Sequence, residues 1–116
     1  MSLLQKLFRP GKKSVRGQFR ILEPAAYRSA IRASDVQLID VRTSGEYRSG
    51  HLPGAVNLDF FQRKAFVREA EGLIKKEPVY VYCRSGNRSR KAAKLLLDLD
   101  FVEVVDLKGG ILNWNA

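Results

Sequence analysis

Residues 78–99 read PVYVYCRSGNRSRKAAKLLLDL. Pro78 precedes a short run of β-branched and aromatic residues, which is typical of a buried strand. From Ser89 onward, apolar residues recur at the spacing of one helix face: Ala92, Ala93, Leu95, Leu96 and Leu99. The stretch therefore predicts a strand, a short polar loop and a helix.

The loop carries the only cysteine of the chain, Cys83. A loop that leads into a helix directs unpaired N–H groups and the positive end of the helix dipole toward one point, so it favours an anion. We expect these groups, together with Arg84 and Arg88, to stabilise the thiolate form of Cys83. A free cysteine at a strand end is often just a small buried apolar side chain. That alternative leaves the polar residues of the loop unexplained, because they are costly to bury unless an anion satisfies them.

The composition fits one domain. The chain has 116 residues and 45% hydrophobic content, enough to bury about two thirds of the surface that the unfolded chain exposes. A single cysteine allows no internal disulfide, and no Cys/His cluster suggests zinc, so neither a metal site nor a cofactor is expected. The free thiol, and the lack of a membrane-length apolar run or a secretory signal, favour the cytoplasm.

Basic residues are concentrated at the start of the chain. Six of them precede the first acidic residue, Glu23: Lys6, Arg9, Lys12, Lys13, Arg16 and Arg20. Residues 1–17 are predicted to be a basic extension before a domain at 18–116. The apolar face of a short helix in this extension comprises Leu3, Leu4, Leu7 and Phe8.

Several interpretations of the extension stay open. It is a flexible segment, a helix docked on the domain or on a partner, or a peripheral contact with an anionic membrane. An organelle transit peptide has a similar composition, so import into an organelle is a further alternative. No aromatic residues are interleaved with the basic ones as in a nucleic-acid-binding module, so no specific nucleic-acid partner is expected.

Strand and helix signals alternate through the rest of the chain. Strands are expected at 18–22, 36–41, 55–58, 79–82 and 102–107, and helices at 24–33, 44–48, within 59–76, at 89–99 and near Trp114. Strands separated by helices predict an α/β fold, a doubly wound, mostly parallel sheet with helices on both faces. Ligands of such sheets bind beyond the carboxyl ends of the strands, where Cys83 lies.

Five motifs follow one another after residue 39. They are Asp40-Val41-Arg42, Glu46-Tyr47, Gly50-His51-Leu52-Pro53-Gly54-Ala55, Cys83-Arg84-Ser85-Gly86-Asn87-Arg88-Ser89, and Leu107-Lys108-Gly109-Gly110 with Trp114. In this order and with these gaps, the chain resembles a single-domain rhodanese, a sulfurtransferase. The resemblance implies a five-stranded sheet, a catalytic Cys83 and a persulfide intermediate. It also implies that a six-residue loop cups the transferred sulfur: Arg84, Ser85, Gly86, Asn87, Arg88 and Ser89.

The remaining motif residues are expected to support this loop. Asp40, Arg42 and Glu46 are interpreted as one ion-paired corner. His51 lies in a turn, where an imidazole can tie backbone groups together, so a structural role is favoured over that of a general base. Gly109, Gly110 and Trp114 are expected to pack the C-terminal segment on the core without a chemical role.

The expected reaction is a two-step sulfur transfer. The Cys83 thiolate takes the outer sulfur of an anionic donor such as thiosulfate, and a thiol, cyanide or a protein cysteine then removes it. A cysteine-dependent phosphatase or arsenate reductase is an alternative, but similar phosphatases have five residues between cysteine and arginine, whereas four separate Cys83 from Arg88. A noncatalytic module that binds a partner or relays sulfur to one protein is another alternative.

Overall fold

The computed structural model describes residues 17–115 and contains one five-stranded sheet with the strand order β2-β6-β5-β3-β4. The strands are β2 (Gln18–Leu22), β3 (Gln37–Asp40), β4 (Val56–Asn57), β5 (Val79–Tyr82) and β6 (Glu103–Leu107). Every neighbouring pair is parallel. The predicted α/β class is therefore confirmed. Residues 1–16, which hold nearly all of the predicted extension, lie outside the described residues.

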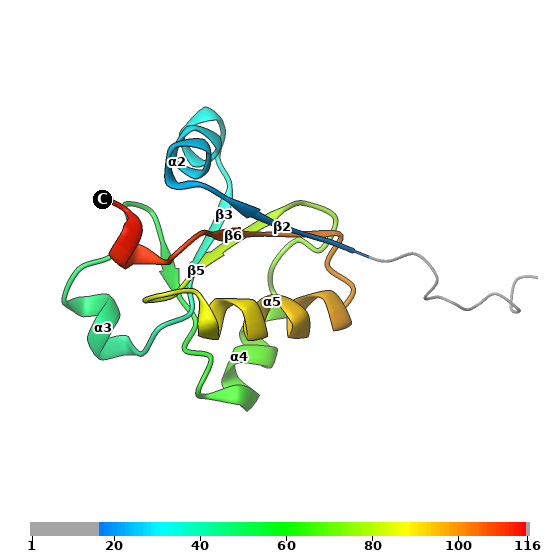
Figure 1. The fold of residues 1–116 in the computed structure, drawn as a ribbon. Helices are drawn as coiled ribbons and strands as arrows, with labels where there is room; N and C mark the ends of the chain where they lie inside the picture. The colour runs from blue at the N-terminus through cyan, green and yellow to red at the C-terminus, as the bar shows by residue number, and fades with distance from the viewer. Residues whose placement is uncertain (1–16, 116) are drawn as a thin grey trace, which may run out of the picture.

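Helices cover both faces of the sheet, as the alternating pattern predicts. They are α2 (Pro24–Ala33), α3 (Ser44–Arg48), α4 (Arg63–Ala70), α5 (Asn87–Asp98) and the 3₁₀ turn η1 (Ile111–Asn113). In Figure 1, α2 lies on one side of the sheet and α4 and α5 lie on the other. All four residues of β5 are buried because this strand is central and covered on both faces.

Two apolar clusters form the core, one on each face. On the α4 and α5 side, Phe66 and Leu96 pack with Val81, Cys83 and Val104 of the sheet region. On the other side, Tyr27 of α2 belongs to a second cluster of buried residues, which also contains Leu38, Leu52, Ala55, Tyr80, Tyr82, Val105 and Leu107. Cys83 thus faces α5, while its neighbour Tyr82 faces the opposite layer.

Helix α5 begins at Asn87, two residues before the predicted start. Gly86 is the residue before the helix and has φ 112°, a left-handed conformation that glycine adopts without strain. This turn brings the chain into the helix sooner than the apolar spacing indicates. Arg88 consequently lies in the first helical turn, beside the cysteine loop.

Helix α5 ends in a motif that normally uses glycine. The Phe101 amide donates to the Leu96 carbonyl at 3.2 Å, and the Asp100 amide donates to the Leu97 carbonyl at 3.0 Å, as in a Schellman motif. Asp100 occupies the left-handed position with φ 76°. An aspartate tolerates this conformation better than most residues, which explains how the helix stops without a glycine.

Strand β4 is shorter than the predicted 55–58. The Asn57 side-chain amide donates to the carbonyls of Asp40 and Arg42, at 3.0 and 2.8 Å. The strand itself comprises only Val56 and Asn57, which pair with Ile39 and Asp40 of β3. In the described part of the chain, no helix is long and apolar enough to cross a membrane.

Candidate active site

Cys83 follows the central strand β5 at the carboxyl edge of the sheet, and the loop that it begins leads into α5. Its side chain is buried, with 1% of the residue exposed. The Gly86 amide donates to Sγ at 3.1 Å, and Sγ lies 3.4 Å from the Ser89 hydroxyl oxygen. The loop therefore folds around the sulfur atom.

The other loop residues divide into exposed and buried ones. Arg84, Ser85 and Asn87 are exposed, and Arg88 is half-buried. Ser89 is fully buried, and its hydroxyl donates to the Gly86 carbonyl at 3.2 Å. Because a hydroxyl can rotate, the same oxygen can accept from a thiol or donate to a thiolate. The Ser89 hydroxyl can therefore form a hydrogen bond with Cys83 whether the cysteine is a thiol or a thiolate.

Arg88 is held by Glu46 of helix α3. Its two terminal guanidinium nitrogens, Nη1 and Nη2, donate to the two carboxylate oxygens at 2.7 and 3.0 Å. This pairing is the largest cause that lowers the pKa of Glu46 to about 2, and it raises the pKa of Arg88 in turn. Cys83 also acts electrostatically on Arg88, so the guanidinium lies within the field of the sulfur.

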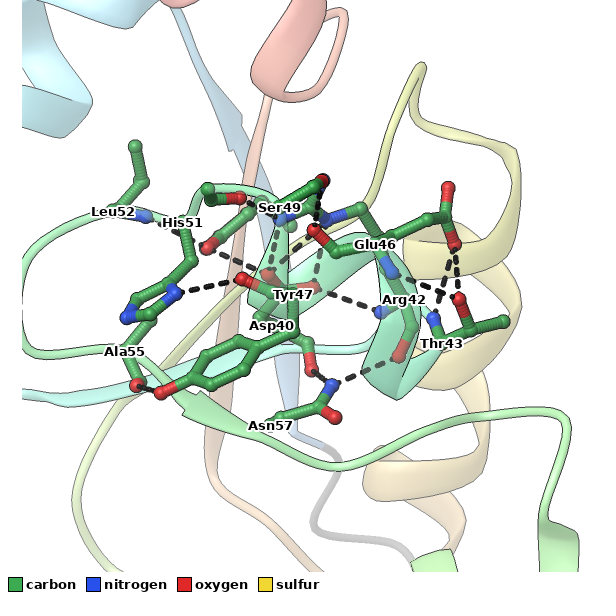
Figure 2. A network of polar contacts seen from close by, with 12 residues as sticks. Asp40, Arg42, Thr43, Glu46, Tyr47, Ser49, His51, Leu52, Ala55 and Asn57 are labelled. Carbon is green, nitrogen blue, oxygen red and sulfur yellow. Dashed lines mark hydrogen bonds and ion pairs between the residues drawn. The ribbon is translucent and has the colours of Figure 1, made fainter.

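Helix α3 positions this glutamate through a capping box. The Thr43 amide donates to the Glu46 carboxylate at 3.0 Å, and the Glu46 amide donates to the Thr43 hydroxyl at 3.2 Å. Figure 2 shows Thr43 and Glu46 side by side in this arrangement. Glu46 therefore contacts the cysteine loop through Arg88. The prediction that Asp40, Arg42 and Glu46 form one ion-paired corner is wrong, because they belong to two separate ion pairs, Asp40–Arg42 and Glu46–Arg88.

The second ion pair joins Asp40 to Arg42 on the opposite layer of the sheet. It is bidentate, with distances of 3.0 and 2.7 Å, and both residues are buried. The Arg42 guanidinium also donates to the Gly50 carbonyl at 2.7 Å, and the Tyr82 hydroxyl donates to Asp40 at 2.8 Å. Hydrogen bonding to Asp40 raises the pKa of Arg42, and burial raises that of Tyr82. The pair thus fixes the residue that directly precedes Cys83.

His51 is exposed and stacks on Tyr47, with ring centroids 3.7 Å apart. Its Nδ1 lies 2.8 Å from the Tyr47 carbonyl, so Nδ1–H is the donor. The Tyr47 hydroxyl in turn donates to the Ala55 carbonyl at 2.6 Å. Figure 2 shows these groups closing the turn at residues 50–55. These contacts support the structural interpretation of His51.

The C-terminal segment takes part in the site, which the sequence interpretation missed. The Ile111 amide donates to the Cys83 carbonyl at 2.9 Å, and the Leu112 amide donates to the Arg84 carbonyl at 3.1 Å. Gly110 has φ 68°, and a Cβ there would come within 2.7 Å of the Cys83 carbonyl oxygen. The Gly-Gly pair was recognised, but its contact with the loop depends on the tertiary fold.

A buried acid, Asp106, was also missed. It lies near the end of β6 with 1% of its surface exposed. The signal was present, since one charged residue interrupts the apolar run Val104-Val105-Asp106-Leu107. Among the described residues, no group of three or more His, Cys, Asp or Glu side chains could hold a metal ion.

Comparison with known proteins identifies the family of this fold. The family model described as a rhodanese-like domain matches residues 23–116. The chain therefore belongs to the rhodanese-like family. A crystal structure of a rhodanese-related protein from Thermoplasma volcanium superposes with a TM-score of 0.71 at 27% identity, covering 83% of this chain and 90% of that one.

Curated relatives include both single-domain and larger proteins. The chain is 36% identical over 93 residues to the thiosulfate sulfurtransferase GlpE of Pseudomonas syringae, covering 80% of this chain and 85% of the relative. It is 35% identical over 93 residues to the adenylyltransferase and sulfurtransferase UBA4 of Meyerozyma guilliermondii, covering 76% of this chain. The chain spans only 22% of the UBA4 relative.

Proposed function

We propose that this chain is a sulfurtransferase that carries a sulfane sulfur on Cys83, with thiosulfate as a donor of the right chemistry. The observation that carries the proposal is the contact of Sγ with the Gly86 amide and the Ser89 hydroxyl in a buried loop. The hydrogen bond from the Gly86 amide, whose direction is fixed by the loop backbone, favours an anionic sulfur. The similarity to a thiosulfate sulfurtransferase over most of both chains supports the same chemistry.

The first half-reaction is a nucleophilic displacement at sulfur. The Cys83 thiolate attacks the outer sulfur of thiosulfate, a new S–S bond forms at Sγ, and the old S–S bond breaks with its electron pair leaving on sulfite. The product is a Cys83 persulfide. Arg84 is exposed at the loop and attracts the anionic donor, whereas Arg88, held by Glu46, contributes a fixed positive charge beside the sulfur.

The second half-reaction removes the outer sulfur. A thiolate or cyanide attacks it, the S–S bond to Sγ breaks, and the electron pair returns to Cys83 as a thiolate. The loop residues that stabilise the first thiolate act again on the leaving sulfur. The acceptor is proposed to be a small thiol or a cysteine of another protein.

Intact mass spectrometry tests the proposal. Thiosulfate is expected to add one sulfur atom to the wild-type protein, and cyanide to remove it as thiocyanate. Cys83→Ser is expected to abolish both steps and keep the fold, while Ser29→Ala, at an exposed position of α2 outside the loop, serves as the control. Unchanged turnover in Cys83→Ser would refute the assignment, and rapid hydrolysis of an aryl phosphate by the wild type would favour a phosphatase instead. Loading with no turnover of small acceptors would indicate a relay to one protein partner.

A further inference from the structure

Two residues with exposed apolar side chains contact the cysteine loop. Phe61 is 64% exposed, and its ring centroid lies 5.2 Å from the guanidinium carbon of Arg88. Leu112 is 59% exposed, and its amide donates to the Arg84 carbonyl at 3.1 Å. The two residues therefore meet the loop near its two ends, Arg84 and Arg88.

A single exposed apolar side chain is common on a protein surface and needs no explanation. The other large ones in the described part of the chain are exposed by 44–55%: Ile21, Val56, Ile74 and Val102. The two most exposed ones are thus the two that contact the loop, although they come from distant parts of the sequence. Apolar side chains gathered at one site commonly mark a surface that a partner covers.

The depth of the sulfur favours a partner with a surface of its own. Cys83 is only 1% exposed, so an acceptor has to come against the loop and the residues that contact it. Cyanide and small thiols have little apolar surface, and they leave Phe61 and Leu112 in water. A protein can bury both side chains, and burial of apolar surface is favourable.

The rim of the loop is also basic. Arg84 and Arg90 are exposed, and Arg90 lies beside Gly86, where a Cβ would be 3.8 Å from its Nη2 atom. Neither arginine forms an ion pair with an acidic residue in the described part of the chain. These two cations are therefore available to a partner with negative charge.

Two carboxylates lie at the same rim. Glu46 is bound by Arg88, and Asp59 accepts from the Phe61 amide at 2.9 Å. Asp59 alone does not balance the two unpaired arginines, so an acidic surface complements the rim. A second copy of this chain fits less well, because the same cations would face each other.

We propose that the sulfur acceptor is an acidic protein segment that carries its cysteine between apolar residues. The apolar residues cover Phe61 and Leu112, and the carboxylates face Arg84 and Arg90. The acceptor thiolate attacks the outer sulfur of the Cys83 persulfide, the S–S bond to Sγ breaks, and the electron pair returns to Cys83. This inference rests on the proposed sulfurtransferase function and names its acceptor.

Transfer of sulfur from the loaded protein to synthetic peptides tests the acceptor. The reference peptide has a central cysteine, a leucine on each side and two glutamates beyond each leucine. A second peptide has serines in place of the leucines, and a third has lysines in place of the glutamates. Each rate is divided by the rate of the same peptide with a small disulfide, which corrects for the reactivity of its thiol. The reference peptide should react about tenfold faster than either of the others; equal rates would overturn the proposal.

Substitutions at the rim separate docking from an effect on the loop itself. Phe61→Ala and Leu112→Ala should each slow transfer to the reference peptide about fivefold, but change removal of the sulfur by mercaptoethanol by less than about twofold. Ile74→Ala is the matched control, because Ile74 is 54% exposed and its backbone binds the side chain of Gln37, the first residue of β3. If the first two variants slowed mercaptoethanol and peptide equally, they would act by positioning the loop, and docking would be refuted.

A second measurement needs no sulfur, so it separates this inference from the proposed function. The unloaded protein is titrated with the reference peptide carrying serine for cysteine, and amide chemical shifts are followed by NMR. The amides of Phe61 and Leu112 should shift and that of Ile74 should not. Unchanged amides at Phe61 and Leu112 would overturn the proposal, whereas the expected shifts in a protein that thiosulfate does not load would refute only the sulfurtransferase function.

The same spectra distinguish the other occupants of the rim. Shifts of the Phe61 and Leu112 amides that follow protein concentration, without peptide, would assign the rim to a second copy of the chain. Shifts caused by phosphatidylserine vesicles but not by the peptide would assign it to a membrane surface. Either result would overturn the acidic protein acceptor.

Discussion

Replacing Glu46 with Gln removes the negative charge of the ion pair that fixes Arg88, so the substitution tests the contribution of that charge. A glutamine at this position can still accept from the Thr43 amide, so the capping box of α3 is kept. The change therefore removes the ionic contact with Arg88 and little else. We expect the variant to fold but to be less stable than the wild type at neutral pH.

The magnitude follows from the pKa of Glu46, which falls from 4.5 to about 2 in the folded protein. At about 1.4 kcal/mol for each pH unit, this difference corresponds to about 3 kcal/mol. The side chains of Arg88 and Glu46 are 19% and 29% exposed, so solvent screening reduces the expected loss to about 1 kcal/mol. Because the folded-state pKa is depressed, this stabilisation is present above pH 4.5 and is lost as the pH falls toward 2.

Urea unfolding at several pH values measures this loss. The free energies of unfolding of wild type and Glu46→Gln should differ at pH 7 and converge as the pH falls below about 4.5. Glu69→Gln removes an exposed carboxylate of α4 and should stay within about 0.5 kcal/mol of the wild type. A loss that is the same at low and neutral pH, or no loss at all, would refute the assignment of a stabilising ion pair.

Four other predictions concern residues elsewhere in the chain. Because burial raises the folded-state pKa of Asp106 from 3.8 to about 6, wild-type stability should fall by up to about 3 kcal/mol as the pH rises through this window. Asp106→Asn should lack that decline in urea titrations, and parallel curves would contradict the burial effect. Asp100→Gly should raise the free energy of unfolding by about 1 kcal/mol, since glycine adopts the left-handed conformation without strain; a decrease would contradict this. Gly110→Ala should cost about 1–3 kcal/mol and most thiosulfate loading, because its methyl group would overlap the neighbouring loop carbonyl. Gly54→Ala, with φ 84° but open space around it, should be strained yet load normally. Equal loading by Gly110→Ala and Gly54→Ala would show that the close packing of Gly110 on the loop does not affect loading. Deleting residues 1–14 should leave loading unchanged. Flotation with anionic vesicles tests the membrane interpretation of this extension, under which each cation adds about 1 kcal/mol that salt weakens and the deletion abolishes flotation; if the full chain does not float, that interpretation fails and a flexible or docked extension remains.

The elements of the fold are predictable because their signals are local. The apolar run at 79–82 and the helical spacing after Ser89 locate β5 and α5 to within two residues. The start of α5 differs because a single left-handed glycine, Gly86, can turn the chain more tightly than apolar spacing reveals. The end of α5 lacks the usual glycine, and Asp100 takes the same backbone conformation with two supporting hydrogen bonds.

The contacts between motifs are harder to predict because they join distant parts of the chain. Glu46 and Arg88 are each visible as motif residues, but their pairing depends on how α3 and α5 approach at the sheet edge. The same holds for Gly110, whose close contact with the Cys83 carbonyl requires the finished fold. Asp106 could have been found, since a charged residue inside an otherwise buried strand calls for an explanation. The chemical roles of the loop residues stay predictions.

The carbonyls of Cys83 and Arg84 bind amides of Ile111 and Leu112, and this contact has a consequence for biosynthesis. A chain leaves the ribosome from its N-terminal end, so Cys83 emerges before the segment that fixes its loop. Until Leu112 has emerged, these two carbonyls lack their partners, although the residues that contact the sulfur, Gly86 and Ser89, are already present. The backbone of the cysteine loop is thus fully held only when the end of the domain docks.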